Sequence, residues 1–377
     1  YALSSWPPVR AASNNSIYTM SIINLLDYGP LFTLSPEERS GRNGDVSPAR
    51  NRSLTHAGFN TFREERMTKR LTRLAVVTLA VALPAFEAAS AQDVTLRAVS
   101  AFPTGSTFQL PFKKFIDEVN AAGDGSVTIN YVGGPEAIPS LEVANAVSSG
   151  VVDIAVVPTS FYTAELPGAA MIKLATTTMP EQRENGCFEL LDTLHQDGMN
   201  TKYLGRTGDH VKFHLYLNKK IEEPDLSGLN LRVAATYQAL FGELGANMVN
   251  TPPGDVYSAL ERGTVDGYGW PSIGIFDLGW DAHTSYRVDP GFYIVDVNFL
   301  ANLDTWNNLT DEQKALLNGK MIDIETGEQE NAQLVEKELA RQEAAGIEAI
   351  TFDGEAGDLW EKTAQDTAIA EIAEADP

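Results

Sequence analysis

The sequence predicts an α/β protein with two lobes, each built on its own β-sheet. From Val94 onward, segments with strand patterns alternate with segments of helical spacing, which is typical of parallel strands joined by crossover helices. The alternation occurs in two sets that meet near residue 210. With 377 residues, 43% of them hydrophobic, the chain has enough apolar material for two cores of ordinary size.

The first 91 residues differ in character from the rest. Residues 1–66 mix Ser, Asn, Arg and Pro without a sustained period, and we expect a disordered extension or one foreign to the natural protein. Residues 67–91 join the basic MTKRLTR to the apolar LAVVTLAVALPAF and the small-residue ASA, the pattern of a secretory signal peptide rather than of a short buried helix. We therefore expect Met67 to be the natural start and Gln92 to begin the exported, mature protein.

The first set of elements predicts lobe I. Its expected strands are VTLRAVSAF, VTINYVG and the almost wholly apolar VDIAVVP, which fits a strand covered on both faces. Three helices are expected in this lobe. The first contains Phe108, Phe112, Phe115, Ile116 and Val119 at helical spacing, the second is LEVANAVSSG, and the third runs from Glu181 to Gly198. The strands TKYLGR and VKFHLYLN follow, and they carry the chain towards the second set.

The second set predicts lobe II. We expect strands at GLNLRVA, NMVNT, VDGYGW and FYIVDVNFL, with helices at TYQALFGELG and GDVYSALERG. A capping box at Thr310 then opens a helical pattern that runs to about Ala345; it either lies along both lobes or breaks near Gly319 or Gly327. IEAITF returns as a strand. The expected lobes are residues 92–210 with 303–340, and residues 211–302 with 341–377.

Charge and motif content exclude several function classes. Residues 92–377 carry 18 Lys or Arg and 44 Asp or Glu, a net charge of −26, which disfavours binding to nucleic acid or anionic lipid. Cys187 is the sole cysteine, so an intrachain disulfide is impossible, and we expect it to be buried. The five histidines lack metal-ligand spacing, and no phosphate-binding, dinucleotide-binding or nucleophile-elbow motif occurs. We expect no cofactor and no metal.

Arg232 is the candidate binding residue that remains. It lies at the end of an expected strand and before a helix, where open α/β sheets bind their ligands. A guanidinium there can donate two parallel hydrogen bonds to a carboxylate. The alternative is a structural salt bridge to one of the many acidic side chains.

The surrounding residues carry a resemblance. DLSGLNLRVAATYQALFGELGANMVNTPPGDVYSALERGTVDG, Asp225–Gly267, resembles the core signature of the substrate-binding proteins of TRAP (tripartite ATP-independent periplasmic) transporters. YVGGPEAIPSLEVANAVSSGVVDIAVVP is similar to the first-lobe helix and strand of that family. The resemblance implies a two-lobed periplasmic-binding-protein clamshell with crossing strands and a long helix spanning both lobes. It also implies a periplasmic receptor that delivers an organic acid to TRAP membrane subunits without catalysis, and we expect this receptor to be a monomer.

The same resemblance makes Arg232 the carboxylate anchor. A second cleft arginine of many members is missing here, and its place falls near Phe213 and His214. The single clear cation favours a monocarboxylate over a dicarboxylate, and the aromatic residues favour a partly apolar or aromatic acid. A hydroxy acid or sugar acid bound through backbone groups and water is the alternative. Further candidates are rim aromatics and first-lobe hydroxyls, namely Tyr268, Trp270, Phe276, Thr104, Ser106, Thr159 and Tyr162. The alternatives are a periplasmic lyase or isomerase with His214 as its acid or base, and an ABC-type solute-binding protein.

Overall fold

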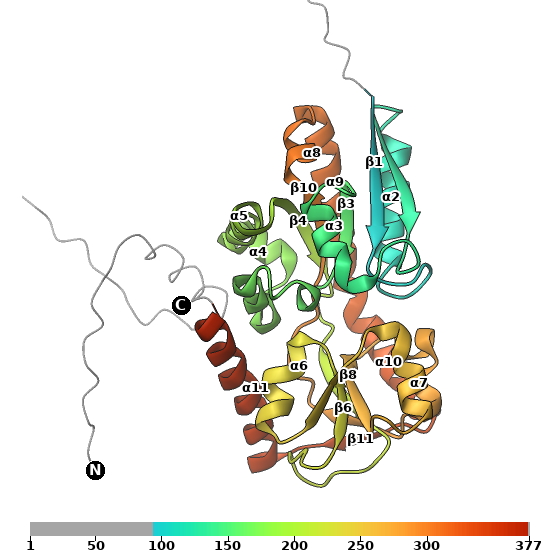
Figure 1. Cartoon of the computed structure of the whole chain (residues 1–377), viewed down its shortest axis with the longest axis vertical. Coiled ribbons are helices and arrows are strands. Elements are labelled where there is room, and N and C mark those ends of the chain that lie inside the picture. The colour runs from blue at the N-terminus through green and yellow to red at the C-terminus, as the bar shows by residue number, and fades with distance from the viewer. Residues whose placement is uncertain (1–92, 376–377) are drawn as a thin grey trace, which may run out of the picture. The chain divides into compact units, whose positions relative to one another are not determined.

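The computed structural model describes residues 93–375, which belong to one compact unit. The predictions made for residues 1–91 lie outside this part of the chain. The described residues form a mixed α/β structure with two sheets (Figure 1), which confirms the predicted fold class. No helix among them is both long and apolar enough to cross a membrane.

The first sheet has five strands. In spatial order they are β2 (Val127–Gly133), β1 (Val94–Ser100), β3 (Ile154–Val157), β10 (Val297–Asn302) and β4 (Thr201–Thr207). β1 pairs with β2 and β3 in parallel, whereas β10 runs antiparallel to β3 and β4. All four residues of β3 are buried, as its apolar sequence predicts for a strand covered on both faces.

The second sheet has six strands. Their order is β11 (Glu348–Thr351), β9 (Tyr286–Asp289), β5 (Phe213–Leu217), β8 (Gly267–Pro271), β6 (Asn230–Val233) and β7 (Asn247–Asn250). β6 runs parallel to β7 and β8, so the loops after these three strands meet at one edge of the sheet. That edge is where open α/β sheets place their ligands.

Helices cover both sheets (Figure 1). α2 (Leu110–Ala122) buries its Phe112, Phe115, Ile116 and Val119 stripe against the first sheet. The other helices are α3 (Val143–Ser148), α4 (Met179–Asn185), α5 (Cys187–Met199), α6 (Ala235–Glu243), α7 (Pro253–Glu261), α8 (Leu303–Asn307), α9 (Asp311–Gly327), α10 (Asn331–Ala344) and α11 (Gly354–Ala375). The expected helix 181–198 is divided because Gly186 adopts φ 89°, a conformation that ends α4. Cys187 is buried, as expected.

Three segments cross from one sheet to the other. Two are extended and antiparallel: the Phe213 amide donates to the Tyr293 carbonyl at 2.9 Å, and the Val295 amide donates to the Val211 carbonyl at 2.9 Å. The third is the helical segment opened by the capping box at Thr310. A short 3₁₀ turn, Glu328–Glu330, separates α9 from α10. α9 packs on the first sheet and α10 contacts the second, so the long helix spans both, with a break just after Gly327.

Two elements differ from the sequence expectation. FYIVDVNFL is an extended crossing segment that becomes a strand only at Val297, and this strand, β10, pairs in the first sheet. Residues 297–302 had been assigned to lobe II. Strand β9, which lies between β11 and β5 in the second sheet, was not predicted, and it pairs with the expected returning strand β11. A long apolar run satisfies either sheet, so its periodicity could not decide between them.

Candidate functional site

Arg232 lies at the end of β6 and is buried, with 1% of its surface exposed. Its Nε donates to the Thr251 carbonyl at 2.8 Å, and its Nη1 lies 3.4 Å from the Gly269 carbonyl. Among residues 93–375 it forms no ion pair with a carboxylate, so the structural salt bridge is absent there. Burial lowers the pKa of Arg232 to about 10. The guanidinium is therefore still charged at neutral pH, and its contacts are two backbone carbonyls and the Trp270 ring, whose centroid lies 5.7 Å from Cζ.

A pocket opens beside Arg232 between the two sheets. The room in it for the centres of water molecules is about 30 Å³, which holds no more than about two waters. Its walls come from the first lobe, from the second lobe and from the crossing segment before β10. They are Phe102, Phe108, Pro158, Ser160 and Phe161; Phe213, Arg232, Ala234, Tyr237, Trp270 and Pro271; and Val295, Asp296 and Val297.

Aromatic rings form most of the pocket wall. Phe108 meets Trp270 edge-on across the two lobes, with ring centroids 6.0 Å apart, and Phe102 lies 5.3 Å from Phe108. On the other side, Phe213 meets Tyr237 edge-on at 5.3 Å. These contacts keep the pocket apolar around one cation, an arrangement that suits an acid with a compact or planar apolar part.

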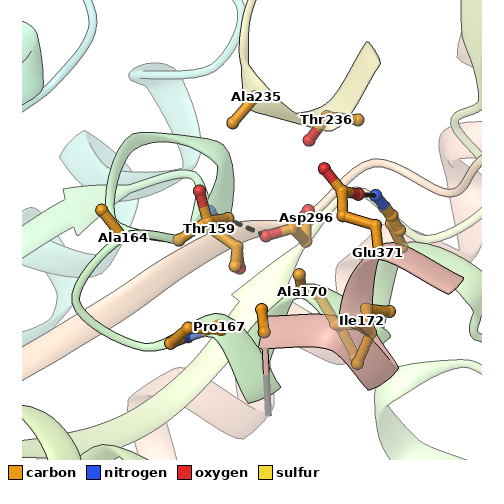
Figure 2. Close-up of a pocket in the computed structure, with 13 residues that line it drawn as sticks. Thr159, Ala164, Pro167, Ala170, Ile172, Ala235, Thr236, Asp296 and Glu371 are labelled. Carbon is orange, nitrogen blue, oxygen red and sulfur yellow. Dashed lines mark hydrogen bonds and ion pairs between the residues drawn. The ribbon is translucent and has the colours of Figure 1, made fainter. Parts of the chain in front are cut away.

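Asp296 is the second charged side chain in the wall. It is 2% exposed, and its Oδ2 accepts hydrogen bonds from the Thr159 amide at 2.9 Å and from Asn298 Nδ2 at 3.0 Å. Burial raises the pKa of Asp296. Asp296 also lines an adjoining pocket (Figure 2), in which the corresponding space is about 170 Å³.

The adjoining pocket lies against α6 and α11. Figure 2 shows Thr236 above Asp296 and Glu371 beside it, with Pro167, Ala170 and Ile172 on the opposite wall. The buried Lys173 pairs with Glu371 at 2.6 Å. This ion pair ties the first-lobe segment Pro167–Leu174 to α11, which also contacts α6 of the second lobe.

Three predicted site residues converge on the pocket, and a fourth lies next to it. Arg232, Phe213 and Trp270 all line the pocket between the lobes. Thr159 lines the adjoining pocket and donates its amide to Asp296. The indole Nε1 of Trp270 is buried and has no hydrogen-bond partner in the described part of the chain.

His214 does not line the pocket, although we expected it to. Successive residues of a strand face opposite sides of the sheet, and Phe213 occupies the side that reaches the pocket. His214 Nδ1 instead lies 3.0 Å from the Val288 carbonyl and 3.0 Å from Asp289 Oδ1. The enzyme alternative thereby loses the acid or base on which it depended.

The remaining candidates have other partners. Tyr268 stacks on Tyr216 with centroids 5.2 Å apart, and its hydroxyl lies 2.7 Å from Thr284 Oγ1. Phe276 packs under the guanidinium of Arg341, 3.7 Å from the ring centroid. Thr104 Oγ1 lies 3.0 Å from the Tyr131 hydroxyl.

Two first-lobe hydroxyls are also turned to their own lobe. Ser106 Oγ donates to the Pro103 carbonyl at 2.7 Å. The hydroxyl of the fully buried Tyr162 lies 3.0 Å from His195 Nε2 and accepts a 2.8 Å bond from Asn298. None of these side chains is in the pocket wall.

The pocket residues that sequence reasoning missed include four aromatic residues and one acid, namely Phe102, Phe108, Phe161, Tyr237 and Asp296. Phe102 follows β1 and Phe161 follows β3, so both lie at the carboxyl ends of parallel strands, a position that could have indicated them. Phe108 and Tyr237 fall within segments that the sequence predicts as helices. Asp296 was hidden in a segment interpreted as a second-lobe strand. No group of three or more His, Cys, Asp or Glu among the described residues is placed to hold a metal ion.

Comparisons with known proteins agree with this geometry. A 2-oxoacid-binding periplasmic protein for monocarboxylates from Nostoc sp. is 25% identical over 208 residues, which cover 51% of this chain and 56% of that relative. A Bordetella bronchiseptica TRAP solute-binding protein, solved with picolinate and calcium in one active site, superposes with a TM-score of 0.65 at 24% identity, covering 75% of this chain and 87% of that one.

A Roseobacter denitrificans TRAP solute-binding protein with bound L-galactonate also superposes with a TM-score of 0.65, at 18% identity, covering 75% of this chain and 96% of that one. The family model for bacterial extracellular solute-binding proteins of family 7 matches residues 99–375. The chain therefore belongs to the bacterial extracellular solute-binding proteins of family 7, which confirms the resemblance identified from the sequence.

Proposed function

We propose that this protein is a periplasmic receptor that binds a small monocarboxylate with a partly apolar side chain and delivers it to TRAP membrane subunits. It acts as a monomer after removal of a signal peptide at residues 67–91, and it does not transform its ligand. The observation that carries the proposal is Arg232, a buried cation beside an aromatic pocket with no ion-pair partner among the described residues. A ligand carboxylate supplies the missing anion.

The pocket chemistry supports a monocarboxylate. Arg232 is the one cation in its wall, whereas Asp296 would oppose a second ligand carboxylate there. The Nostoc relative is described as a binder of monocarboxylate 2-oxoacids, and the Bordetella structure contains picolinate, an aromatic monocarboxylate. Both ligand types match a pocket that combines one guanidinium with aromatic walls.

The small size of the pocket supports binding by lobe closure. Little free space remains in it, and its wall draws on both lobes and on the crossing segments. An acid must therefore enter while the lobes are apart and become enclosed as they close, with the crossing segments and the 3₁₀ turn after α9 as the hinge. In this proposal, lobe I consists of residues 92–210 and 303–340 together with β10, which the sequence assigned to lobe II.

A panel of monocarboxylates, dicarboxylates and sugar acids, screened by thermal shift and then by calorimetry, tests the proposal. We expect a monocarboxylate to raise the unfolding temperature. Arg232→Ala should weaken its binding by about 100-fold or more, because two charge-assisted bonds contribute roughly 1.5–3 kcal/mol each. Arg232→Lys keeps the positive charge but cannot donate two parallel hydrogen bonds. Its affinity for the acid should therefore lie between those of the wild type and Arg232→Ala.

Arg262→Ala is the matched control, because Arg262 is an exposed cation of the same lobe with no role in the pocket. Circular dichroism and the unfolding temperature establish that each variant is folded. The proposal is contradicted if no acid stabilises the wild type. It is also contradicted if folded Arg232→Ala and Arg232→Lys both bind the acid as tightly as the wild type does. Conversion of the bound acid, followed by NMR, contradicts the absence of catalysis.

A further inference from the structure

Asp296 lies where the two pockets meet, and it forms no ion pair within residues 93–375. It lines both the pocket beside Arg232 and the adjoining pocket at α11. Arg206 pairs with Asp209 at 2.7 Å and Lys173 pairs with Glu371, whereas no ion pair to Asp296 occurs among residues 93–375. Among the described residues, Asp296 Oδ2 accepts hydrogen bonds from the Thr159 amide and from Asn298 Nδ2, and the Thr159 side chain also stabilises the ionised carboxyl. These two bonds leave Oδ1 as the oxygen for a ligand.

The surroundings of Asp296 disfavour a second negative charge. Burial already raises the pKa of Asp296, and Arg206 is the cation that acts most clearly against this effect. The charged and titratable side chains facing it from the packed elements are Tyr162, Lys173 with its partner Glu371, Tyr203, Arg206, Arg232 and Tyr237. The three tyrosines are neutral, because burial raises the pKa of each.

A bound carboxylate brings a like charge to this wall. Arg232 can neutralise one carboxylate but not two, and two anions enclosed in one dry pocket interact unfavourably. The same crowding is what makes paired carboxyl groups share a proton. The least costly complex therefore contains Arg232 as a cation, the ligand as an anion and Asp296 as a neutral carboxylic acid.

We propose that Asp296 takes up a proton from solvent when the acid binds, and that Oδ1 then donates a hydrogen bond to an acceptor oxygen next to the ligand carboxylate. The inference rests on the proposed receptor function and specifies its substrate class as 2-oxo acids. A carbonyl oxygen beside the carboxylate accepts this bond, whereas an unsubstituted acid leaves it unmade. A 2-amino acid brings an ammonium group, which an ionised Asp296 would favour and a protonated one disfavours.

Calorimetry with three matched probes tests the inference on the full chain. The probes are 4-methyl-2-oxopentanoate, 4-methylpentanoate and leucine, which share one branched side chain. We expect the 2-oxo acid to bind about tenfold more tightly than either of the others, because they leave the buried Asp296 donor without an acceptor. Tighter binding of leucine would mean that Asp296 stays ionised and would overturn the proposal.

Proton uptake is measured directly by repeating the titration at several pH values between about 5 and 9, each time in two buffers that hold that pH and differ in ionisation enthalpy. We expect uptake to rise towards one proton per ligand as the free protein ionises, with affinity falling up to about tenfold per pH unit in that range. Asp296→Asn keeps a neutral donor and should bind the 2-oxo acid without proton uptake and with flat pH dependence. Glu243→Gln, an exposed carboxylate change on α6 outside both pockets, should keep the wild-type profile.

The outcomes separate the two proposals. If the wild type binds the 2-oxo acid with no proton uptake at any pH, the role of Asp296 is wrong while the receptor function stands. If Arg232→Ala abolishes binding of an acid that shows no preference for a 2-oxo group, only the substrate class fails. If no acid in the panel binds, the receptor proposal itself fails. The wild-type titrations decide the matter even if Asp296→Asn does not fold.

Discussion

Removing the carboxylate of Asp277 should open the protein and weaken ligand binding. The Thr107 amide in the first lobe donates a 2.7 Å hydrogen bond to Asp277 Oδ2 in the second, beside the Phe108–Trp270 contact. Hydrogen bonds to charged groups contribute about 1.5–3 kcal/mol, and because this bond is exposed, we take the lower value. Asp277→Ala should therefore destabilise the closed state by about 1.5 kcal/mol and weaken apparent affinity by up to about tenfold.

The assay combines calorimetry with solution scattering. The tightest-binding acid of the panel gives the affinity, and the radius of gyration of the unliganded protein reports the balance of open and closed forms. Asp281→Ala is the matched control: it removes one negative charge from the neighbouring 3₁₀ turn, where the side chain has no cross-lobe bond among the described residues. Equal affinities and equal radii for Asp277→Ala and Asp281→Ala would refute the reasoning.

Two further predictions concern stability. Gly205→Ala should lower the free energy of unfolding in urea by about 3 kcal/mol or more. The reason is that φ is +148° and that the added Cβ would lie 1.9 Å from Glu325 Oε1, which Arg183 holds in place. The control Gly319→Ala, which has open space on α9, should be neutral or slightly stabilising. Burial lowers the pKa of His195 to about 4. Between about pH 6.5 and 4 the unfolded chain therefore binds a proton more tightly than the folded chain. Stability is lost as the pH falls through this range, by roughly 3 kcal/mol at about pH 4. His195→Gln should lose less between pH 7 and 4.5, and an unchanged pH profile would contradict this.

The sequence predicted Arg232 because its signal is local. A short alternating strand followed at once by a helix places one residue at the carboxyl edge of the sheet, and no distant contact is needed to know this. Phe213 and His214 show the limit of such reasoning. Both were candidates by position, but adjacent strand residues face opposite sides, and only the pairing of β5 with β8 and β9 decides which side reaches the pocket.

Asp296 could not be predicted in the same way. Its segment crosses between the sheets, and strand periodicity is equally compatible with either sheet. Its importance arises from contacts more than 130 residues apart, such as the bond from the Thr159 amide. Because the chain contains 51 Asp and Glu, the sequence alone cannot single out one aspartate. Asp296 becomes a candidate only when its burial and its lack of an ion pair among the described residues are known.

The placement of these groups ties recognition to closure. Arg232 comes from the second sheet, Phe102 and Phe108 come from the first, and Asp296 lies on a segment that joins the two. When the lobes are apart, water can reach both charged groups and separates their fields from the ligand. In the proposed closure this water leaves, so the attraction between the guanidinium and the ligand carboxylate and the free-energy cost of an ionised Asp296 both increase. A neutral Asp296 removes the cost while keeping the attraction, and in this way one proton can stabilise the closed complex without any new contact between the lobes.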